Sequence, residues 1–314
     1  MSPRRTYVVA CLAGHGIGPE VMAEASRALA SVSRLHGFAV QEVHPPFDGE
    51  AVTQSGRAFP AYTRNATLAA DAVLVAGASA PALDAVKAEL DLAGSVSRTL
   101  LPDDGALTVF APLEQSRASW TIEQALTAAR ARTGLLVSVG TTRAWHEEVA
   151  LHVERDGAIG LRQLTLADAL HALTTAPATL GVVVTERVLA DALADIPRVG
   201  GRARPLRATG LLSPLGPGLY GPTHGSALDI AGQGVANPSE MLLAAALMLG
   251  EGLGRWAAAD TLEQSLAATL RRPVQTPDMI ETGVAATTRE FVDVVLGLLP
   301  AARRDTEFSP EPAL

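Results

Sequence analysis

Cysteine, lysine and aromatic residues are scarce in this chain of 314 residues. Cys11 is the only cysteine, which excludes an intrachain disulfide and favours a cytoplasmic location. A net charge of −8 provides little basic surface for nucleic acid, so the expected partner is a small molecule. The apolar run from Tyr7 to Ala13 is too short for a signal sequence or a membrane span, and no membrane partner is expected.

Hydrophobic residues make up 48% of the chain and aromatic residues only 4%, so alanine, leucine and valine supply most of the core. This composition is typical of a buried parallel sheet covered by alanine-rich helices, an α/β fold. Apolar runs predict strands at 7–12, 39–43, 71–76, 107–112, 135–139 and 181–185. Helical periodicity predicts a first helix that ends near Ser33. It also predicts helices at 63–70, 121–132, 168–174, 186–196, 239–249, 260–270 and 287–299. Turns or loops are expected at 77–84, 197–217 and 219–238.

Residues 219 to 238 form a turn-rich stretch in front of an apolar helix. Gly221, Gly225, Gly232 and Gly234 allow left-handed backbone or the close approach of a ligand. Asn237, which precedes a proline, sets up the start of the helix that follows. A binding loop and an ordinary surface loop both fit this spacing.

The stretch from His224 to Pro238, HGSALDIAGQGVANP, resembles the adenosine-binding loop of the isopropylmalate/isocitrate dehydrogenases, the NAD(P)-dependent β-decarboxylating dehydrogenases. The resemblance implies that His224 lies near the adenine and that Asp229 accepts hydrogen bonds from the ribose hydroxyls. Asp229-Ile230 implies NAD rather than NADP, because a carboxylate repels a 2′-phosphate. The expected cofactor-binding residues are His224, Gly225, Ser226, Ala227, Asp229, Ile230 and Asn237.

The N-terminal glycine turn carries the same resemblance. AGHGIGPEV, from Ala13 to Val21, matches the family's first turn with one change, His15 in place of aspartate. Together the two stretches imply a two-domain α/β fold with a parallel or mixed sheet covered by helices, similar to isopropylmalate dehydrogenase. Residues 1–96 and 209–314 would form a discontinuous nucleotide-binding domain, and 97–208 a second domain through which the chain forms a homodimer.

Asp191 and Asp195 are the candidate metal ligands. Their i, i+4 spacing places both carboxylates on one helix face, where they could bind Mg²⁺ or Mn²⁺. A solvated helix face would show the same pattern. The resemblance favours the metal, because this helix occupies the family's metal-binding position, with Asp168 as a further candidate.

The middle of the chain departs from the family pattern at its substrate and catalytic positions. Lys87 and Ser97 stand where two substrate-binding arginines are expected, and Arg98 is one place out of register. The family's catalytic tyrosine segment is missing, and Gly140-Thr141-Thr142 replaces its Asp-Lys pair. His146 is the substitute general acid or base, because its ordinary pKa lies near neutrality, although a surface histidine fits as well.

The resemblance therefore implies an NAD-dependent oxidoreductase that acts on a 2-hydroxy acid with an altered substrate or reaction. The alternative is a catalytically lapsed paralogue that binds nucleotide as a regulatory or structural partner. A third interpretation is a metal-dependent lyase that does not use NAD.

Overall fold

The computed structural model describes residues 5–101, 105–199, 206–280 and 284–300. Within them, ten strands form one sheet in the order β2-β1-β3-β10-β9-β4-β5-β8-β6-β7. The strands are β1 (Thr6–Ala13), β2 (Ala39–Val43), β3 (Ala72–Ala76), β4 (Gly94–Leu100), β5 (Ala106–Pro112), β6 (Leu135–Gly140), β7 (Gly160–Thr165), β8 (Val182–Thr185), β9 (Leu206–Leu212) and β10 (Gly218–Pro222). The sheet is mixed: β2, β1, β3 and β10 run parallel to one another, as do β5, β8, β6 and β7. Antiparallel pairs through β9 and β4 join these two halves.

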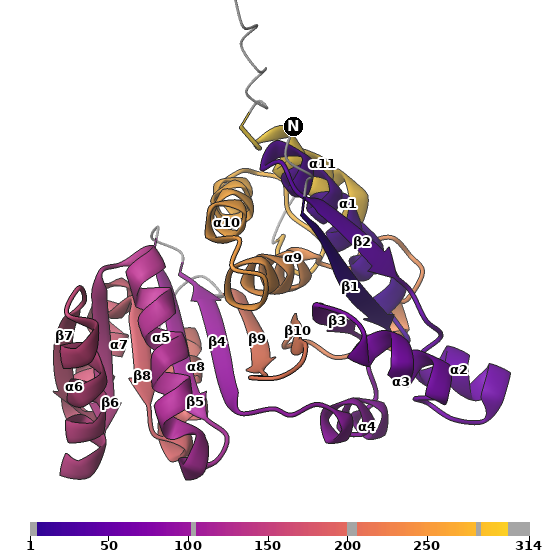
Figure 1. Ribbon diagram of the computed structural model, residues 1–314. Coiled ribbons are helices and arrows are strands. Elements are labelled where there is room, and N and C mark those ends of the chain that lie inside the picture. The colour runs from indigo at the N-terminus through magenta and orange to yellow at the C-terminus, as the bar shows by residue number, and fades with distance from the viewer. Residues whose placement is uncertain (1–4, 102–104, 200–205, 281–283, 301–314) are drawn as a thin grey trace, which may run out of the picture.

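Helices cover both faces of the sheet, as Figure 1 shows. They are α1 (Gly18–Leu35), α2 (Asp48–Ser55), α3 (Ala61–Leu68), α4 (Ala80–Glu89), α5 (Ala118–Arg132), α6 (Arg143–Asp156), α7 (Leu166–Thr175), α8 (Ala190–Val199), α9 (Ser239–Leu247), α10 (Trp256–Leu270) and α11 (Thr288–Gly297). Helix α9 continues into a π-helical segment, η5 (Met248–Gly252). No helix in the described part of the chain has the length and hydropathy that a membrane crossing requires.

Alternate residues of each strand enter different cores. Val9 and Cys11 of β1 face the largest apolar cluster, to which α1, α5, α6, α9, α10 and α11 contribute, and Ala10 faces a second cluster with α4. In the other half of the sheet, Val109 of β5 faces a third cluster with α7 and α8. Because successive strand residues point to opposite faces, the front of the sheet is here defined as the α4 and α8 side and the back as the α1 and α9 side.

The α/β class is confirmed, and most predicted elements are present with ends shifted by a few residues. Three expectations of loop structure were wrong. The turn at 77–84 is shorter, since α4 begins at Ala80 with Ser79 as its N-cap. Strand β9 lies inside the predicted loop 197–217, and β10 takes the start of the predicted loop 219–238.

Strands β9 and β10 were not predicted because both contain glycine. A Cβ at Gly210 would lie 2.7 Å from the ring of Tyr220, so the glycine makes room for the tyrosine across the β9–β10 pair. Such a cross-strand fit cannot be read from local propensity, which disfavours glycine in strands. Arg202 and Arg204 of the predicted loop lie outside the described residues.

The sequence division into 1–96 with 209–314 and 97–208 stays a prediction. The boundary positions near 97 and 209 lie in β4 and β9, whose antiparallel pairing joins the two halves of the sheet.

Candidate functional site

Three chain segments meet at the carboxyl ends of β1, β3 and β10. The turn after β1 is bonded to the turn after β3, with Gly14 N donating to Ala76 O at 2.8 Å and His15 N donating to Gly77 O at 2.9 Å. Ile17 N donates to Ser226 O at 2.8 Å and thereby attaches the loop after β10 to the N-terminus of α1. This edge of an α/β sheet is where ligands characteristically bind.

Gly16 permits the closest of these contacts. Its φ is +63°, and a Cβ there would lie 1.8 Å from the carbonyl oxygen of Ser226. A side chain would both strain the backbone and push the loop away.

Two glutamates hold the ends of the loop. At the first end, the Oε2 of Glu240 accepts hydrogen bonds from Thr223 N at 2.9 Å and His224 N at 3.2 Å. At the other end, the Oε1 of Glu20 in α1 accepts from Ala236 N at 3.1 Å and from Thr288 Oγ1 at 2.6 Å. The loop from residue 223 to residue 236 is therefore fixed at both of its ends.

The seven residues expected to bind the cofactor lie on this loop. Ala227 has a left-handed φ of +36°, and the Asp229 side chain is exposed in the short helix η4 (Leu228–Ile230). Within the described chain, the Asp229 carboxylate makes no hydrogen bond or ion pair. The Nε2 of His224 is buried without a hydrogen-bond partner in the same part of the chain. Asn237 is already engaged, since its Oδ1 accepts from Ser239 N at 3.0 Å and its Nδ2 donates to Asp278 at 3.0 Å.

His15, which replaces the family's aspartate, contacts the buried Asp48. The His15 Nδ1 lies 2.8 Å from Asp48 Oδ2, and Asp48 also accepts from Ser79 N at 2.6 Å and Ser79 Oγ at 2.9 Å. Burial acts to raise the pKa of Asp48, but the hydrogen bonds from Ser79 and His15 hold it below its ordinary value. His15 thus helps to hold the two glycine turns and α2 together.

A cavity of about 170 Å³ opens on the front face of β4 and β9, beside α8. Its polar side chains are Ser95, Ser97, Thr209, Arg187, Asp191 and Arg207. The Oγ of Ser97 and the Nε of Arg207 are buried and have no hydrogen-bond partner among the described residues. Arg187 and Arg207 give the wall of the cavity two cationic groups, a charge that suits an anionic ligand.

The two predicted metal ligands lie beside this cavity, and each faces an arginine. Arg187 Nη1 lies 3.5 Å from Asp191 Oδ2, and Arg207 Nη1 lies 2.9 Å from Asp195 Oδ1. Among the described residues, no third carboxylate, histidine or thiol approaches them as a ligand. In this arrangement an arginine lies beside each carboxylate, so a divalent ion could bind only with both arginines turned aside and with water completing its oxygen ligands. The metal assignment stays a prediction.

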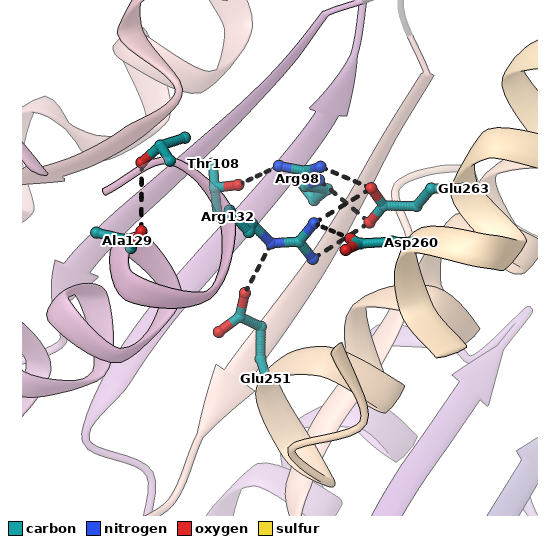
Figure 2. Close-up of polar contacts among 8 residues, drawn as sticks. Arg98, Thr108, Ala129, Arg132, Glu251, Asp260 and Glu263 are labelled. Carbon is teal, nitrogen blue, oxygen red and sulfur yellow. Dashed lines mark hydrogen bonds and ion pairs between the residues drawn. The ribbon is translucent and has the colours of Figure 1, made fainter. Parts of the chain in front are cut away.

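A second cavity, of about 350 Å³, lies on the back face of β4 and β5, beside α10. It borders a buried ionic cluster, shown in Figure 2, in which the guanidinium groups of Arg98 and Arg132 point at the Glu263 carboxylate. Arg98 binds Glu263 through two hydrogen bonds, Nε to Oε1 at 3.2 Å and Nη2 to Oε2 at 2.6 Å. Its third donor, Nη1, binds Thr108 at 2.6 Å.

The two buried glutamates of the cluster, Glu263 and Glu251, differ in their protonation state. Burial opposes ionisation of Glu263, but Arg98 and Arg132 outweigh it and keep the pKa of Glu263 below its ordinary value. Burial raises the pKa of Glu251 to about 8, although the same two arginines act in the opposite direction. Glu251 therefore carries a proton at neutral pH while Glu263 is ionised.

Comparison with known proteins shows the family of this chain. The sequence pattern of the isocitrate/isopropylmalate dehydrogenases matches residues 114–295, more than half of the chain. The chain belongs to the isocitrate/isopropylmalate dehydrogenase family. It is 30% identical to the 3-isopropylmalate dehydrogenase of Salinibacter ruber over 89% of this chain and 91% of that one. It is 29% identical to the enzyme of the same name from Synechococcus sp. strain CC9605, over 88% of this chain and 94% of that one.

Solved structures bear out the fold of the family. The β-decarboxylating dehydrogenase of Thermococcus kodakarensis superposes with a TM-score of 0.79 at 22% identity, covering 93% of this chain and 96% of that one. The isocitrate dehydrogenase of Methylococcus capsulatus gives 0.72 at 19% identity, covering 93% and 99%. The matched family is one of dehydrogenases, so the chain is an oxidoreductase in this general sense.

The predicted substrate and acid–base residues of this family member do not meet at one site. The Lys87 Nζ lies on α4, 3.7 Å from Asp84, and does not line the front cavity. Arg98 lies on the back face of β4, with all its donor groups directed into the ionic cluster. The Nδ1 of His146 on α6 lies 3.1 Å from Ser138 Oγ, and His146 lines neither cavity.

Arg207 and Glu240 belong to the candidate site but are not among the residues predicted for it. The expected loop 197–217 contains Arg207 in a basic run, which could meet an anionic substrate but favours a solvated linker. Glu240 has no predicted role. An alternating strand pattern from Leu206 onward would have placed Arg207 and Thr209 on one face. Glu240, in the first turn of α9, could have been noticed as a carboxylate beside unsatisfied loop amides.

Proposed function

We propose that this chain is an NAD-dependent dehydrogenase of a small 2-hydroxy acid, with a substrate different from that of its better-preserved relatives. The observation that carries the proposal is the exposed, unpaired Asp229 carboxylate on a loop fixed at both ends by Glu240 and Glu20. Membership of a dehydrogenase family supports the same conclusion.

NAD fits the loop chemistry. Asp229 would accept hydrogen bonds from the adenosine ribose hydroxyls, and its charge would repel the extra phosphate of NADP. The buried, unpartnered Nε2 of His224 would be satisfied by an adenine nitrogen. When bound, NAD supplies the hydride acceptor.

The front cavity is the proposed substrate site. Arg207 Nε and Ser97 Oγ would bind the substrate carboxylate, and Arg187 adds positive charge at the rim. A volume of about 170 Å³ suits an acid of few carbon atoms and leaves no room for a bulky one. The proposal includes a homodimer formed through residues 97–208. It also includes a requirement for Mg²⁺ or Mn²⁺ at Asp191 and Asp195. Binding of the metal would require Arg187 and Arg207 to turn aside.

The alternative is a catalytically lapsed paralogue that binds nucleotide without turnover. It is favoured by one observation, that neither Lys87 nor His146 reaches the front cavity. General acid–base groups supply about 10²–10⁴-fold in rate, so their absence from the site would leave turnover very slow.

The test is NADH formation over a panel of 2-hydroxy acids with and without Mg²⁺, together with NAD titration by calorimetry. We expect NAD binding and turnover with at least one short-chain acid. NAD binding without turnover on any acid would establish the regulatory paralogue. Mg²⁺ binding without NAD binding would instead indicate a lyase.

Arg207→Met provides the matched check on the substrate site. It should raise KM for the acid by about 10-fold or more, the effect of losing a charge-assisted hydrogen bond, and leave NAD affinity unchanged. An unchanged KM would place the substrate elsewhere.

A further inference from the structure

Three side chains with metal-ligating atoms meet at the β2 edge of the sheet, away from both cavities. Cys11 lies on β1, Glu42 on β2, and His44 just beyond the end of β2. Glu42 is paired in register with Val9, so Cys11, two residues after Val9, points to the same back face as Glu42 and His44. Each side chain offers one ligand atom, the Sγ of Cys11, a carboxylate oxygen of Glu42 and a ring nitrogen of His44, and these three atoms lie within 4.8 Å of one another. No other group of three such residues occurs in the described chain.

The spacing is close to that of a zinc site. Zinc binds sulfur at about 2.3 Å and nitrogen or oxygen at about 2.0–2.2 Å, so tetrahedral ligand atoms lie roughly 3.3–3.8 Å apart. Glu42 Oε2 and His44 Nε2 are already 3.0 Å apart. The His44 side chain is 52% exposed and Glu42 17%, so both can move by the small remaining distance, while Cys11 is fixed in the core.

The surroundings of the trio favour a cation. Ser26 Oγ on α1 donates to Glu42 Oε2 at 2.5 Å, an orienting contact of the kind that supports metal ligands. A divalent ion would neutralise both a thiolate and a carboxylate, and the thiol proton would leave to solvent as the metal–sulfur bond forms.

We propose that Cys11, Glu42 and His44 form a Zn²⁺ site, with water as the fourth ligand. Sulfur and imidazole together select a borderline-soft ion over Mg²⁺, which prefers oxygen ligands only. The ion would fasten the edge strand β2 to β1. This site is independent of the proposed dehydrogenase activity.

Cobalt substitution tests the site on the full chain. A thiolate bound to Co²⁺ gives a near-ultraviolet charge-transfer band, and Cys11 is the only cysteine, so the band can come from no other residue. We expect a band that saturates at one Co²⁺ per chain and is displaced by Zn²⁺. Cys11→Ser should abolish it, and His44→Ala should weaken Zn²⁺ binding by at least about 10-fold, as expected for loss of a ligand.

Two controls keep the result specific. His36→Ala removes a histidine that bonds Thr261 instead, and should leave the band unchanged. The double variant Asp191→Asn with Asp195→Asn should also keep it, which separates this site from the carboxylates of α8. Absence of the band in the unmodified chain, or a band that survives Glu42→Gln together with His44→Ala, would overturn the proposal even if Cys11→Ser fails to fold.

Discussion

The Nε of Arg132 lies 4.0 Å from Oε1 of Glu251, and neither atom has a hydrogen-bond partner among the described residues. Arg132 ends α5, in the half of the sheet that contains β5 to β8, and Glu251 lies in η5, behind the other half. This open contact spans the two halves at the back of the sheet. The protonation state of Glu251 therefore affects how strongly the two halves of the sheet are held together.

Glu251→Gln should remove a pH dependence of stability. Burial raises the pKa of Glu251 from 4.5 to about 8, so the folded state holds a proton that the unfolded state has released between these values. Stability must then fall as pH rises from about 4.5 to about 8. The free energy of unfolding should lose on the order of 3–5 kcal/mol across this window in the parent chain and less in the variant.

Urea denaturation at several pH values between 5 and 8.5 measures this effect. Glu154→Gln, an exposed change on α6, should keep the slope of the parent. Parallel curves for the parent and Glu251→Gln would show that Glu251 is ionised in the folded chain.

Glu263→Gln should strongly destabilise the fold. It leaves the buried Arg98 without its two-bond partner and removes the carboxylate shared with Arg132. Removing one member of a buried ion pair costs about 3–5 kcal/mol. Chemical denaturation beside Glu154→Gln gives the comparison, and a loss below about 1 kcal/mol would mean that solvent replaces the contact.

Gly16→Ala should weaken NAD binding and stability together. The new Cβ would lie 1.8 Å from Ser226 O, so the loop after β10 must move away from α1. Gly56→Ala is the matched control, because Gly56 also has a positive φ, +74°, but has no atom within 4 Å of the new Cβ. The control should lose about 1 kcal/mol from backbone strain alone, and Gly16→Ala clearly more. Equal losses, with NAD affinity intact, would argue against a steric role for this turn.

Asp229→Lys should exchange the cofactor preference. Loss of charge-assisted hydrogen bonds to the ribose costs about 1.5–3 kcal/mol, which corresponds to roughly 10- to 150-fold in NAD affinity. A lysine should at the same time improve binding of NADP, whose phosphate it attracts. Calorimetry with both nucleotides measures this, with Glu154→Lys as a charge-matched control. Unchanged NAD affinity would mean that the ribose contact is misplaced.

The proposed nucleotide-binding loop could be predicted from sequence because its residues act locally. His224 to Asn237 are consecutive, and their glycines and polar groups serve one short stretch of backbone. The supporting contacts were not readable, since Glu20 lies 216 residues from the Ala236 amide that it accepts from. Only the packing of α1 against the loop brings them together.

The residues of the proposed substrate site could not be predicted from sequence, for a related reason. Ser97 and Arg98 are neighbours in sequence, yet a strand directs Ser97 to the front cavity and Arg98 to the back cluster. Assigning a role to Arg98 required knowing that residues 94–100 form a strand and which face carries the site. The same alternation places Arg207, from the expected loop 197–217, on the same front face as Ser97.

The two cavities share β4 as a common wall, with Ser97 lining the front cavity and Arg98 lining the back one. The residues that line the two cavities are different, so β4 is an element through which they touch. A ligand that displaced β4 from one side would change the volume available on the other.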